Sequence, residues 1–435
     1  MKECPSMSRL LLLMTTTTYK ARAFIEAAQR LDLPVTIGSE QPQILAAANP
    51  AAHLTLNFLE PEEATRQIVA FAQTHPLQAI VAADDDGVIL AAMAAKALGL
   101  VHNPVEAVLA ARNKYQMRKV LAEAGLPSPR FTCLSIHTDP QAVAEGIPFP
   151  CVVKPLALSA SRGVIRADTP AQFVAAFHRV VHLLQQPEPA GAERRFATQI
   201  LVEDFIPGQE VALEGLLSHG QLRVLALFDK PDPLEGPFFE ETIYVTPSRF
   251  PPALQEAIQS CTQQAITALG LREGPIHAEL RVNDNGPWVL EIAPRSIGGL
   301  CSRTLRFTDG ISLEEVILRQ AMGFDITGIR REERAAGVMM IPIPQAGILR
   351  EIHGQSDAEH VPGIEEIRLT IPPGQVVIPP PEGSRYLGFI FARGDTPEEV
   401  ETALRAAHQR LTFTIDPLPP SAPPLSESPP LPTPA

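Results

Sequence analysis

Cysteine is scarce in this sequence, with five residues among 435. They are scattered and odd in number, and no two form a CxxC pair. Disulfide frameworks use paired cysteines and zinc sites use closely spaced ones, so the pattern argues against both. We therefore expect buried thiols in a protein of the reducing cytosol, which means a cytoplasmic location. The cysteines are Cys4, Cys133, Cys151, Cys261 and Cys301.

Positive charge and long apolar runs are scarce as well. The net charge of −13 argues against nucleic acid and anionic membranes as partners, because both favour clustered Lys and Arg. No apolar run approaches the roughly 20 residues of a membrane-spanning helix. The run at residues 10–14 is too short for a signal-peptide core and has no small-residue cleavage site after it. We expect a first buried strand there, with residues 1–8 as a loose leader.

A glycine-rich phosphate loop is missing after this first predicted strand. Residues 15–18 contain no glycine and form neither GxGxxG nor GxxxxGK[ST], so no dinucleotide or P-loop site is expected there. Residues 9–110 still alternate apolar strands with helical stretches, which predicts a parallel sheet with crossover helices. Residues 84–86, three aspartates, end one strand. We favour a helix N-terminal cap for them over ligand binding at the edge of the sheet.

The length and composition predict several domains and a tail. A chain of 435 residues is too long for one ordinary core, and 45% hydrophobic residues are ample for burial. The pattern changes character near residue 111 and becomes short strands and turns with one helix beyond residue 331. Residues 416–435 are rich in proline and serine, which predicts a disordered tail.

The most informative stretch is residues 276–299, IHAELRVNDNGPWVLEIAPRSIGG, which predicts a β-hairpin. Asp284, Asn285 and Gly286 supply the turn. Centring the turn on Asn285 pairs Glu279 with Glu291. Strict alternation then assigns a core face and a site face. The core face is Ile276, Ala278, Leu280, Val282, Trp288, Leu290 and Ile292, and the site face is His277, Glu279, Arg281, Val289 and Glu291.

The two paired glutamates predict a metal site. Directly opposed side chains lie about 5 Å apart at Cβ, where like charges repel unless a positive charge lies between them. Two carboxylates completed by water and substrate phosphates suit Mg²⁺, with Mn²⁺ as the alternative. A second interpretation is a solvated strand face on which Arg281 neutralises both acids.

Three further features precede the hairpin. Lys114 begins a helix, and Lys154 ends a buried strand that opens into a loop of small residues. Such a loop lets backbone N–H groups approach an anion, although a serine-rich surface turn would have the same composition. Glu203 and Glu210 then flank a Phe205–Ile206 linker. The small residues of the loop are Ser159, Ala160, Ser161 and Gly163.

The order of these features resembles the ATP-grasp ligases over residues 9–330. The segments FDKP…PFFEE…TPS and HAELR…LEIAPRSIGG, and the unit after residue 331, are most similar to the L-amino-acid ligase branch. The resemblance implies an α/β and α+β multidomain fold. Its parts are an N-terminal parallel α/β (pre-ATP-grasp) domain at 1–110, a two-lobed ATP-grasp domain with its lid at 111–200 and central lobe at 201–330, and a small C-terminal α+β domain at 331–415.

The resemblance also implies roles for single residues. Lys114 and Lys154 would contact ATP phosphates, with the 159–163 loop closing over them. Glu279 and Glu291 would hold Mg²⁺ or Mn²⁺, and Arg295 would stabilise the transferring phosphoryl group. One departure is Ala293, because the family usually has Asn there, which leaves open whether one or two ions bind. In the linker, Glu203 would begin the segment, the backbone near Phe205 and Ile206 would hydrogen-bond adenine, and Glu210 would bind the ribose hydroxyls.

The implied activity is ATP-dependent carboxylate–amine ligation through an acyl phosphate, with small carboxylate and amine substrates that are most plausibly amino acids. The alternatives are a carboxylase subunit, a purine-pathway ligase, and a nucleotide-binding protein that has lost catalysis. Arg303 and Arg306 would clamp a substrate carboxylate or lie on the surface. We expect no nucleic-acid or membrane partner, and a homodimer is the default oligomer.

Overall fold

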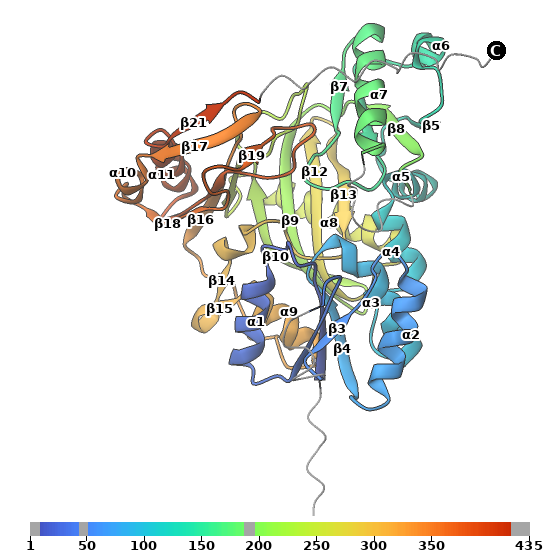
Figure 1. The fold of residues 1–435 in the computed structure, drawn as a ribbon, viewed down its shortest axis with the longest axis vertical. Helices are drawn as coiled ribbons and strands as arrows, with labels where there is room; N and C mark the ends of the chain where they lie inside the picture. The colour runs from blue at the N-terminus through green and yellow to red at the C-terminus, as the bar shows by residue number, and fades with distance from the viewer. Residues whose placement is uncertain (1–8, 43–50, 187–195, 419–435) are drawn as a thin grey trace, which may run out of the picture.

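A computed structural model describes residues 9–42, 51–186 and 196–418. The predicted leader and almost all of the predicted tail, residues 1–8 and 419–435, lie outside the described residues. Within the described part, no helix has both the length and the hydropathy that crossing a membrane requires. Figure 1 shows the N-terminal unit at the bottom, the lid at the upper right, and the C-terminal strands at the left of a long central sheet.

The N-terminal unit is a parallel sheet in the order β3-β2-β1-β4, as the alternating pattern predicted. Residues 10–13 of β1 are fully buried because helices cover both faces of the sheet. The strand β3 and the helix α2 were not predicted from the sequence. The elements are β1 Arg9–Leu13, α1 Ala21–Arg30, β2 Val35–Ser39, β3 His53–Thr55, α2 Pro61–Ala72, β4 Leu77–Ala82 and α3 Asp85–Leu98.

The lid is an antiparallel sheet in the order β5-β8-β6-β7, with α7 packed on it through Phe173 and Phe177. Asn113 caps the helix that begins at Lys114, because its side chain accepts from the N–H groups of Tyr115 and Gln116. The elements are α4 Val105–Arg112, α5 Lys114–Glu123, β5 Phe131–Ser135, α6 Pro140–Val143, β6 Cys151–Pro155, β7 Ile165–Ala167, α7 Pro170–Leu184 and β8 Gln199–Asp204.

An eight-stranded sheet in the order β13-β12-β9-β10-β11-β16-β20-β18 forms the centre. It joins strands from both sides of the predicted boundary at residue 331, since β11 pairs with β16. The multidomain α/β and α+β class is confirmed, and the domain limits stay predictions. The elements are β9 Gln209–Ser218, β10 Gln221–Asp229, β11 Ile243–Thr246, α8 Pro252–Leu269, β12 Gly274–Asn283, β13 Gly286–Ala293, α9 Leu313–Ala321, β16 Ala335–Ile341, β18 Ile364–Leu369 and β20 Gly388–Gly394.

The rest of the C-terminal unit packs beside this sheet. A second sheet has the order β19-β17-β21, and a capping box at Thr396 and Glu399 starts its main helix. These elements are β17 Gly347–His353, α10 Gln355–Glu359, β19 Val376–Val377, α11 Pro397–His408 and β21 Thr412–Asp416.

The β12–β13 hairpin confirms the predicted pairing of Glu279 with Glu291, although by a different geometry. Asn283 pairs with Gly286, so the loop between the strands is one residue shorter than in a turn centred on Asn285. A bulge between Glu279 and Leu280 then shifts the register by one residue. The bulge compensates for the tighter turn and brings the two glutamates opposite each other.

The same bulge makes the predicted faces wrong for part of β13. Val289 pairs with Leu280 and is buried in the core, although strict alternation placed it on the site face. Trp288 pairs with Arg281, and Leu290 lines the cavity described below, although both were assigned to the core. Alternation fails here because the bulge inserts one residue into the strand.

The loop after β6 depends on a glycine. Gly163 has φ +73°, and a Cβ there would lie 2.8 Å from Leu183 Cδ2 and 2.9 Å from Pro155 Cγ. Its N–H donates to the carbonyl of Pro381, 2.8 Å away in the C-terminal unit. Backbone angle and packing therefore both select glycine at this position.

Gly163→Ala should lower the midpoint of thermal unfolding more than Gly125→Ala. Gly125 has φ +71° but nothing within 4 Å of the added Cβ, so its variant carries the backbone cost alone. Gly163→Ala adds overpacking, which typically costs about 1–3 kcal/mol. Equal midpoints for the two variants, measured by circular dichroism, would show that the packing of Gly163 is unimportant.

Candidate active site

One cavity of about 430 Å³ lies where the N-terminal unit, the lid, the central sheet and the C-terminal unit meet. Of the residues expected to bind the nucleotide or metal or to act in catalysis, Gly163 alone does not line it, and its N–H is bonded to Pro381 instead. The predicted residues that line the cavity are Lys114, Lys154, Ser159, Ser161, Glu203, Phe205, Ile206, Glu210, Glu279, Glu291 and Arg295.

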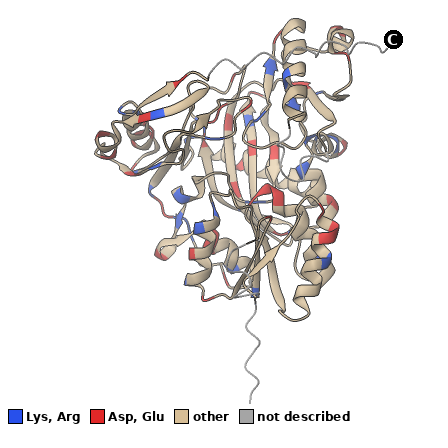
Figure 2. Ribbon diagram, in the orientation of Figure 1, with Lys and Arg blue, Asp and Glu red and all other residues tan. Residues whose placement is uncertain are grey.

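The glutamate pair at the centre of the cavity is neutralised by the protein's own cations. Lys114 Nζ lies 3.0 Å from a carboxylate oxygen of Glu291, and Lys230 Nζ lies 3.7 Å from one of Glu279. Both carboxylates are partly exposed to the cavity, by 24% for Glu279 and 21% for Glu291. The interpretation in which Arg281 neutralises both acids is wrong, since Arg281 pairs with Glu210 at 3.2 Å. Figure 2 shows several acidic residues, in red, along the central strands.

A buried histidine connects Glu279 to the core. His277 Nδ1 lies 2.5 Å from Glu214, and Nε2 lies 3.2 Å from Glu279. Burial alone would lower the pKa of His277, but the hydrogen bonds to the two glutamates raise it to about 9. The other oxygen of Glu214 accepts from the N–H of Ile297 at 3.1 Å. His277 was expected on the site face of the hairpin, whereas nothing in the local sequence pointed to Glu214.

The glutamate pair fits a hard divalent cation. Burial alone raises the pKa of Glu279, but the Lys230 charge and the His277 hydrogen bond bring it below its ordinary value, so the group is ionised. A second group of acids, Glu210, Glu241 and Glu279, has ligand atoms within 4.8 Å of one another. Lys230 contacts Glu210 at 2.7 Å and also Glu241, so an ammonium already neutralises that group. Lys114 and Lys230 contact Glu291 and Glu279 in the same way, so both groups of carboxylates are candidates for a metal.

The start of the linker is held by a buried network around Glu203. Arg118 is fully buried and donates to Glu203 through Nε at 2.8 Å, and Lys154 contacts the same carboxylate at 2.5 Å. Burial alone raises the pKa of Glu203, but the two cations lower it to about 2. Arg118 also donates to the carbonyls of Val289 at 2.9 Å and Leu290 at 3.0 Å. It thus satisfies carbonyls on an edge strand of the sheet, directly before Glu291.

The linker backbone is partly engaged by the protein. The N–H of Phe205 donates to Pro150 O at 3.0 Å, and the carbonyl of Ile206 accepts from Arg281 at 2.9 Å. The Phe205 ring lies under two guanidinium groups, 4.2 Å from that of Arg166 and 4.9 Å from that of Arg281. The predicted adenine contacts near Phe205 and Ile206 stay predictions.

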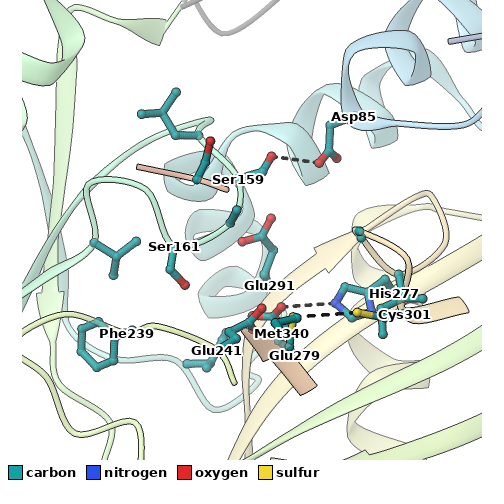
Figure 3. A pocket seen from close by; sticks show the side chains of 18 of the residues that line it. Asp85, Ser159, Ser161, Phe239, Glu241, His277, Glu279, Glu291, Cys301 and Met340 are labelled. Atoms are coloured by element: carbon teal, nitrogen blue, oxygen red, sulfur yellow. Dashed lines mark hydrogen bonds and ion pairs between the residues drawn. The ribbon is translucent and has the colours of Figure 1, made fainter. Parts of the chain in front are cut away.

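Arg295 is held by an aspartate of the N-terminal unit. Its guanidinium lies 3.0 Å from Asp85, which also pairs with Arg112 at 2.9 Å and accepts from Ser159 Oγ at 2.9 Å. Burial alone raises the pKa of Asp85, but Arg112 and Arg295 hold it well below its usual range. Figure 3 shows the contact between Asp85 and Ser159 above the glutamates.

The cap prediction for residues 84–86 is therefore incomplete. Asp84 does occupy the N-cap of α3, but its side chain makes no capping hydrogen bond, and Asp85 reaches into the cavity. Lys20 lies beside them, almost fully buried, and donates to the carbonyls of Ala83 at 2.9 Å and Ser296 at 3.0 Å. The loop of residues 15–20, which lacks a phosphate motif, lines the cavity through side chains that the sequence analysis missed.

The two arginines considered as a carboxylate clamp point elsewhere. Arg303 pairs with Glu366 at 2.5 Å, and Arg306 pairs with Glu365 at 2.8 Å. Both arginine side chains are more than 40% exposed, and neither lines the cavity. They are surface charges, which was the other interpretation of the sequence.

Three known domain families match successive parts of the chain. Residues 25–102 match the ATP-grasp N-terminal domain, residues 147–304 the ATP-grasp domain, and residues 339–416 the L-amino acid ligase C-terminal domain 2. The structure is similar to that of the L-amino acid ligase from Bacillus licheniformis, with a TM-score of 0.79 and 27% identity, covering 95% of this chain and 100% of that chain.

Two named relatives match over a smaller share of each chain. The chain is 26% identical to dapdiamide A synthase from Enterobacter agglomerans, over 75% of this chain and 73% of that protein. It is 27% identical to the alanine–anticapsin ligase of Bacillus amyloliquefaciens, over 59% of this chain and 56% of that protein. This chain therefore spans little more than half the length of the latter relative.

Arg118→Lys should destabilise the protein far more than Arg130→Lys. Both arginines pair with an acid at the end of β8, but Arg118 is fully buried, whereas the Arg130 side chain is 78% exposed beside Asp204. Breaking a buried charge network costs about 3–5 kcal/mol, and an exposed pair contributes about 0–1 kcal/mol. Thermal unfolding should show a large drop for Arg118→Lys and almost none for Arg130→Lys. Similar midpoints would contradict the role given to Arg118.

Proposed function

Because the chain is an ATP-grasp protein that carries the C-terminal domain of the L-amino acid ligases, we propose that it is an ATP-dependent carboxylate–amine ligase. Its substrates are two amino acids, or an amino acid and another small carboxylic acid. The products are an amide, ADP and phosphate. The similarity to dapdiamide A synthase and alanine–anticapsin ligase supports amino acids as the substrate class.

One observation carries the proposal: a single cavity holds the glutamate pair together with Lys114, Lys154 and the buried Arg295. Lys114 touches Glu291 at 3.0 Å, and Arg295 enters from the loop four residues later. Cations that converge on a carboxylate pair suit phosphoryl transfer, in which charge spreads over the phosphoryl oxygens. A nucleotide-binding protein without catalysis would have no need for Arg295 in this place.

Each predicted residue has a role in this chemistry. Glu279 and Glu291 would hold Mg²⁺, or Mn²⁺, which neutralises negative charge on the β- and γ-phosphates when bound. Ala293 supplies no ligand atom, so the pair accounts for one such ion. Lys114 and Lys154 bind phosphate oxygens, and they exchange their present partners, Glu291 and Glu203, for them. The remaining roles are phosphate cover by Ser159 and Ser161, whose loop turns at Gly163, adenine contacts by the backbone near Phe205 and Ile206, and ribose contacts by Glu210.

Arg295 acts on the reacting groups. A carboxylate is a poor electrophile, so its oxygen first attacks the γ-phosphorus of ATP, and ADP leaves. The amine then attacks the acyl phosphate carbonyl, and phosphate leaves with the former carboxylate oxygen. A planar, permanently charged guanidinium can bind the transferring phosphoryl group and then the tetrahedral oxyanion. Asp85 aims this guanidinium from the N-terminal unit.

The test is phosphate release with pairs of amino acids. Phosphate and ADP should appear in equal amounts, and only when a suitable pair is present. Glu291→Gln should lower this rate at least about a hundredfold, because removing one charge-stabilising group typically costs about 10²–10³ in rate. Thermal unfolding would verify that the variant is folded.

A matched control is Glu366→Gln, which removes a surface carboxylate that pairs with Arg303 outside the cavity. It should keep wild-type turnover. Release of AMP and pyrophosphate, or phosphate release that ignores the amino acids, would contradict the proposal. A cytoplasmic location and a homodimer stay predictions.

A further inference from the structure

The cavity contains two separate apolar patches with the charged groups between them. One belongs to a small cluster next to the linker, and the other belongs to the large core cluster beneath the central sheet. Figure 3 shows Phe239 on one side and Cys301 on the other, with Glu241 and Glu279 between them and Met340 in contact with Cys301. The first patch is Val152, Val164, Phe205 and Phe239, and the second patch is Tyr19, Tyr244, Ile297, Cys301, Met340 and Tyr386.

The first patch suits the nucleotide base. It adjoins the linker at Phe205 and Ile206, and the Phe205 and Phe239 rings stack with centroids 6.3 Å apart. Flat aromatic and aliphatic walls beside backbone hydrogen-bonding groups fit a purine. With the base there and the phosphates on the lysines, the second patch is left for a different molecule.

The second patch is a fixed wall built by three parts of the chain. Tyr19 comes from the N-terminal unit and Tyr386 from the C-terminal unit, and both contact Phe389, with centroids 5.8 Å and 6.0 Å away. Between them, Cys301 Sγ lies 3.8 Å from Met340 Sδ. Both of these sulfur-bearing residues are at most 3% exposed, so the wall is already packed from behind.

The charged groups beside the second patch have partners already. Lys20 donates to the carbonyls of Ala83 and Ser296, and Glu241 contacts Lys230. A charged side chain placed against Lys20 or Glu241 would therefore displace one of these contacts or stay unpaired. Burying an unpaired charge is expensive, whereas apolar contact is favourable.

The second patch also lies next to the reacting groups. Ile297 follows Arg295 by two residues, and its N–H is fixed by Glu214, which also holds His277 beside Glu279. A substrate whose carboxylate reaches Arg295 and the glutamate pair therefore has this patch beside its side chain. We propose that the amino acid whose carboxylate is phosphorylated has an uncharged, apolar side chain that packs on the second patch. This inference rests on the proposed ligase function.

Hydroxylamine trapping tests the inference with one amino acid at a time. The amino acid carboxylate takes the γ-phosphoryl group and releases ADP. Hydroxylamine then attacks the carbonyl and forms a hydroxamate, phosphate leaves, and the nitrogen loses a proton. Leucine, methionine and phenylalanine should give hydroxamate with kcat/KM at least about tenfold above alanine, since each methylene in an apolar pocket changes it by about 10–200-fold. Aspartate, glutamate, lysine and arginine should give still less. Equal or higher values for the charged amino acids would overturn the inference.

A pair of variants separates the two patches. Tyr386→Ala removes one wall of the second patch and should raise KM for the amino acid at least about tenfold, with little change in KM for ATP. Phe239→Ala should raise KM for ATP, with little change in KM for the amino acid. Tyr386→Phe keeps the apolar wall and should restore the amino acid KM to within about twofold of the wild-type value. An effect of Tyr386→Ala on ATP alone would overturn the assignment.

Failure of the ligase function has a different signature, in which ATP binds but no amino acid yields hydroxamate or ADP. In that case, the rise in the midpoint of thermal unfolding on adding a free amino acid in the presence of ATP still compares apolar with charged side chains. Greater stabilisation by leucine, methionine and phenylalanine than by the charged set would support the patch as their site. Equal stabilisation by both sets would overturn it.

Discussion

The repulsion between Glu279 and Glu291 is the constraint on which the rest of the site depends. Two carboxylates held opposite each other in a hairpin need positive charge nearby, and the chain supplies it from three directions. Lys114 comes from α5, Lys230 from the end of β10, and His277 from β12 itself. These cations offset the repulsion within the pair, and they keep the pKa of Glu279 below its ordinary value. A site built this way is prepared for a ligand that brings phosphates and a divalent ion together.

The site also needs the glutamate pair to stay in place relative to the lid. Arg118 connects the two parts, because its guanidinium binds Glu203 at the end of the lid strand β8 and also the carbonyl of Leu290, directly before Glu291. Lys114 and Arg118 are four residues apart on α5, so one helix face addresses both the side chain and the backbone of β13. Asp85, from the N-terminal unit, holds the Arg295 side chain in place through an ion pair of 3.0 Å. The cavity is thus fixed by buried ion pairs that cross between units.

The sequence predicted those features that depend on local pattern. The alternation of strands and helices predicted the parallel N-terminal sheet, and the turn residues of the hairpin predicted the glutamate pairing. Alternation could not reveal the bulge, so Val289 and Leu290 were assigned to the wrong faces. Asp85 was interpreted as part of a helix cap because its partner, Arg295, lies 210 residues away. Glu214 and Arg118 escaped notice for the same reason, since a buried charge is recognised by its partners, and those come from distant segments.

The most direct test of the central claim follows one oxygen atom. If the carboxylate attacks the γ-phosphorus, a substrate labelled with ¹⁸O in its carboxylate should transfer one labelled oxygen to the released phosphate in each turnover. Mass spectrometry of the phosphate would measure that transfer. Phosphate with one ¹⁸O per molecule is the result that we predict. Unlabelled phosphate, or label found in AMP, would contradict activation of the substrate as an acyl phosphate.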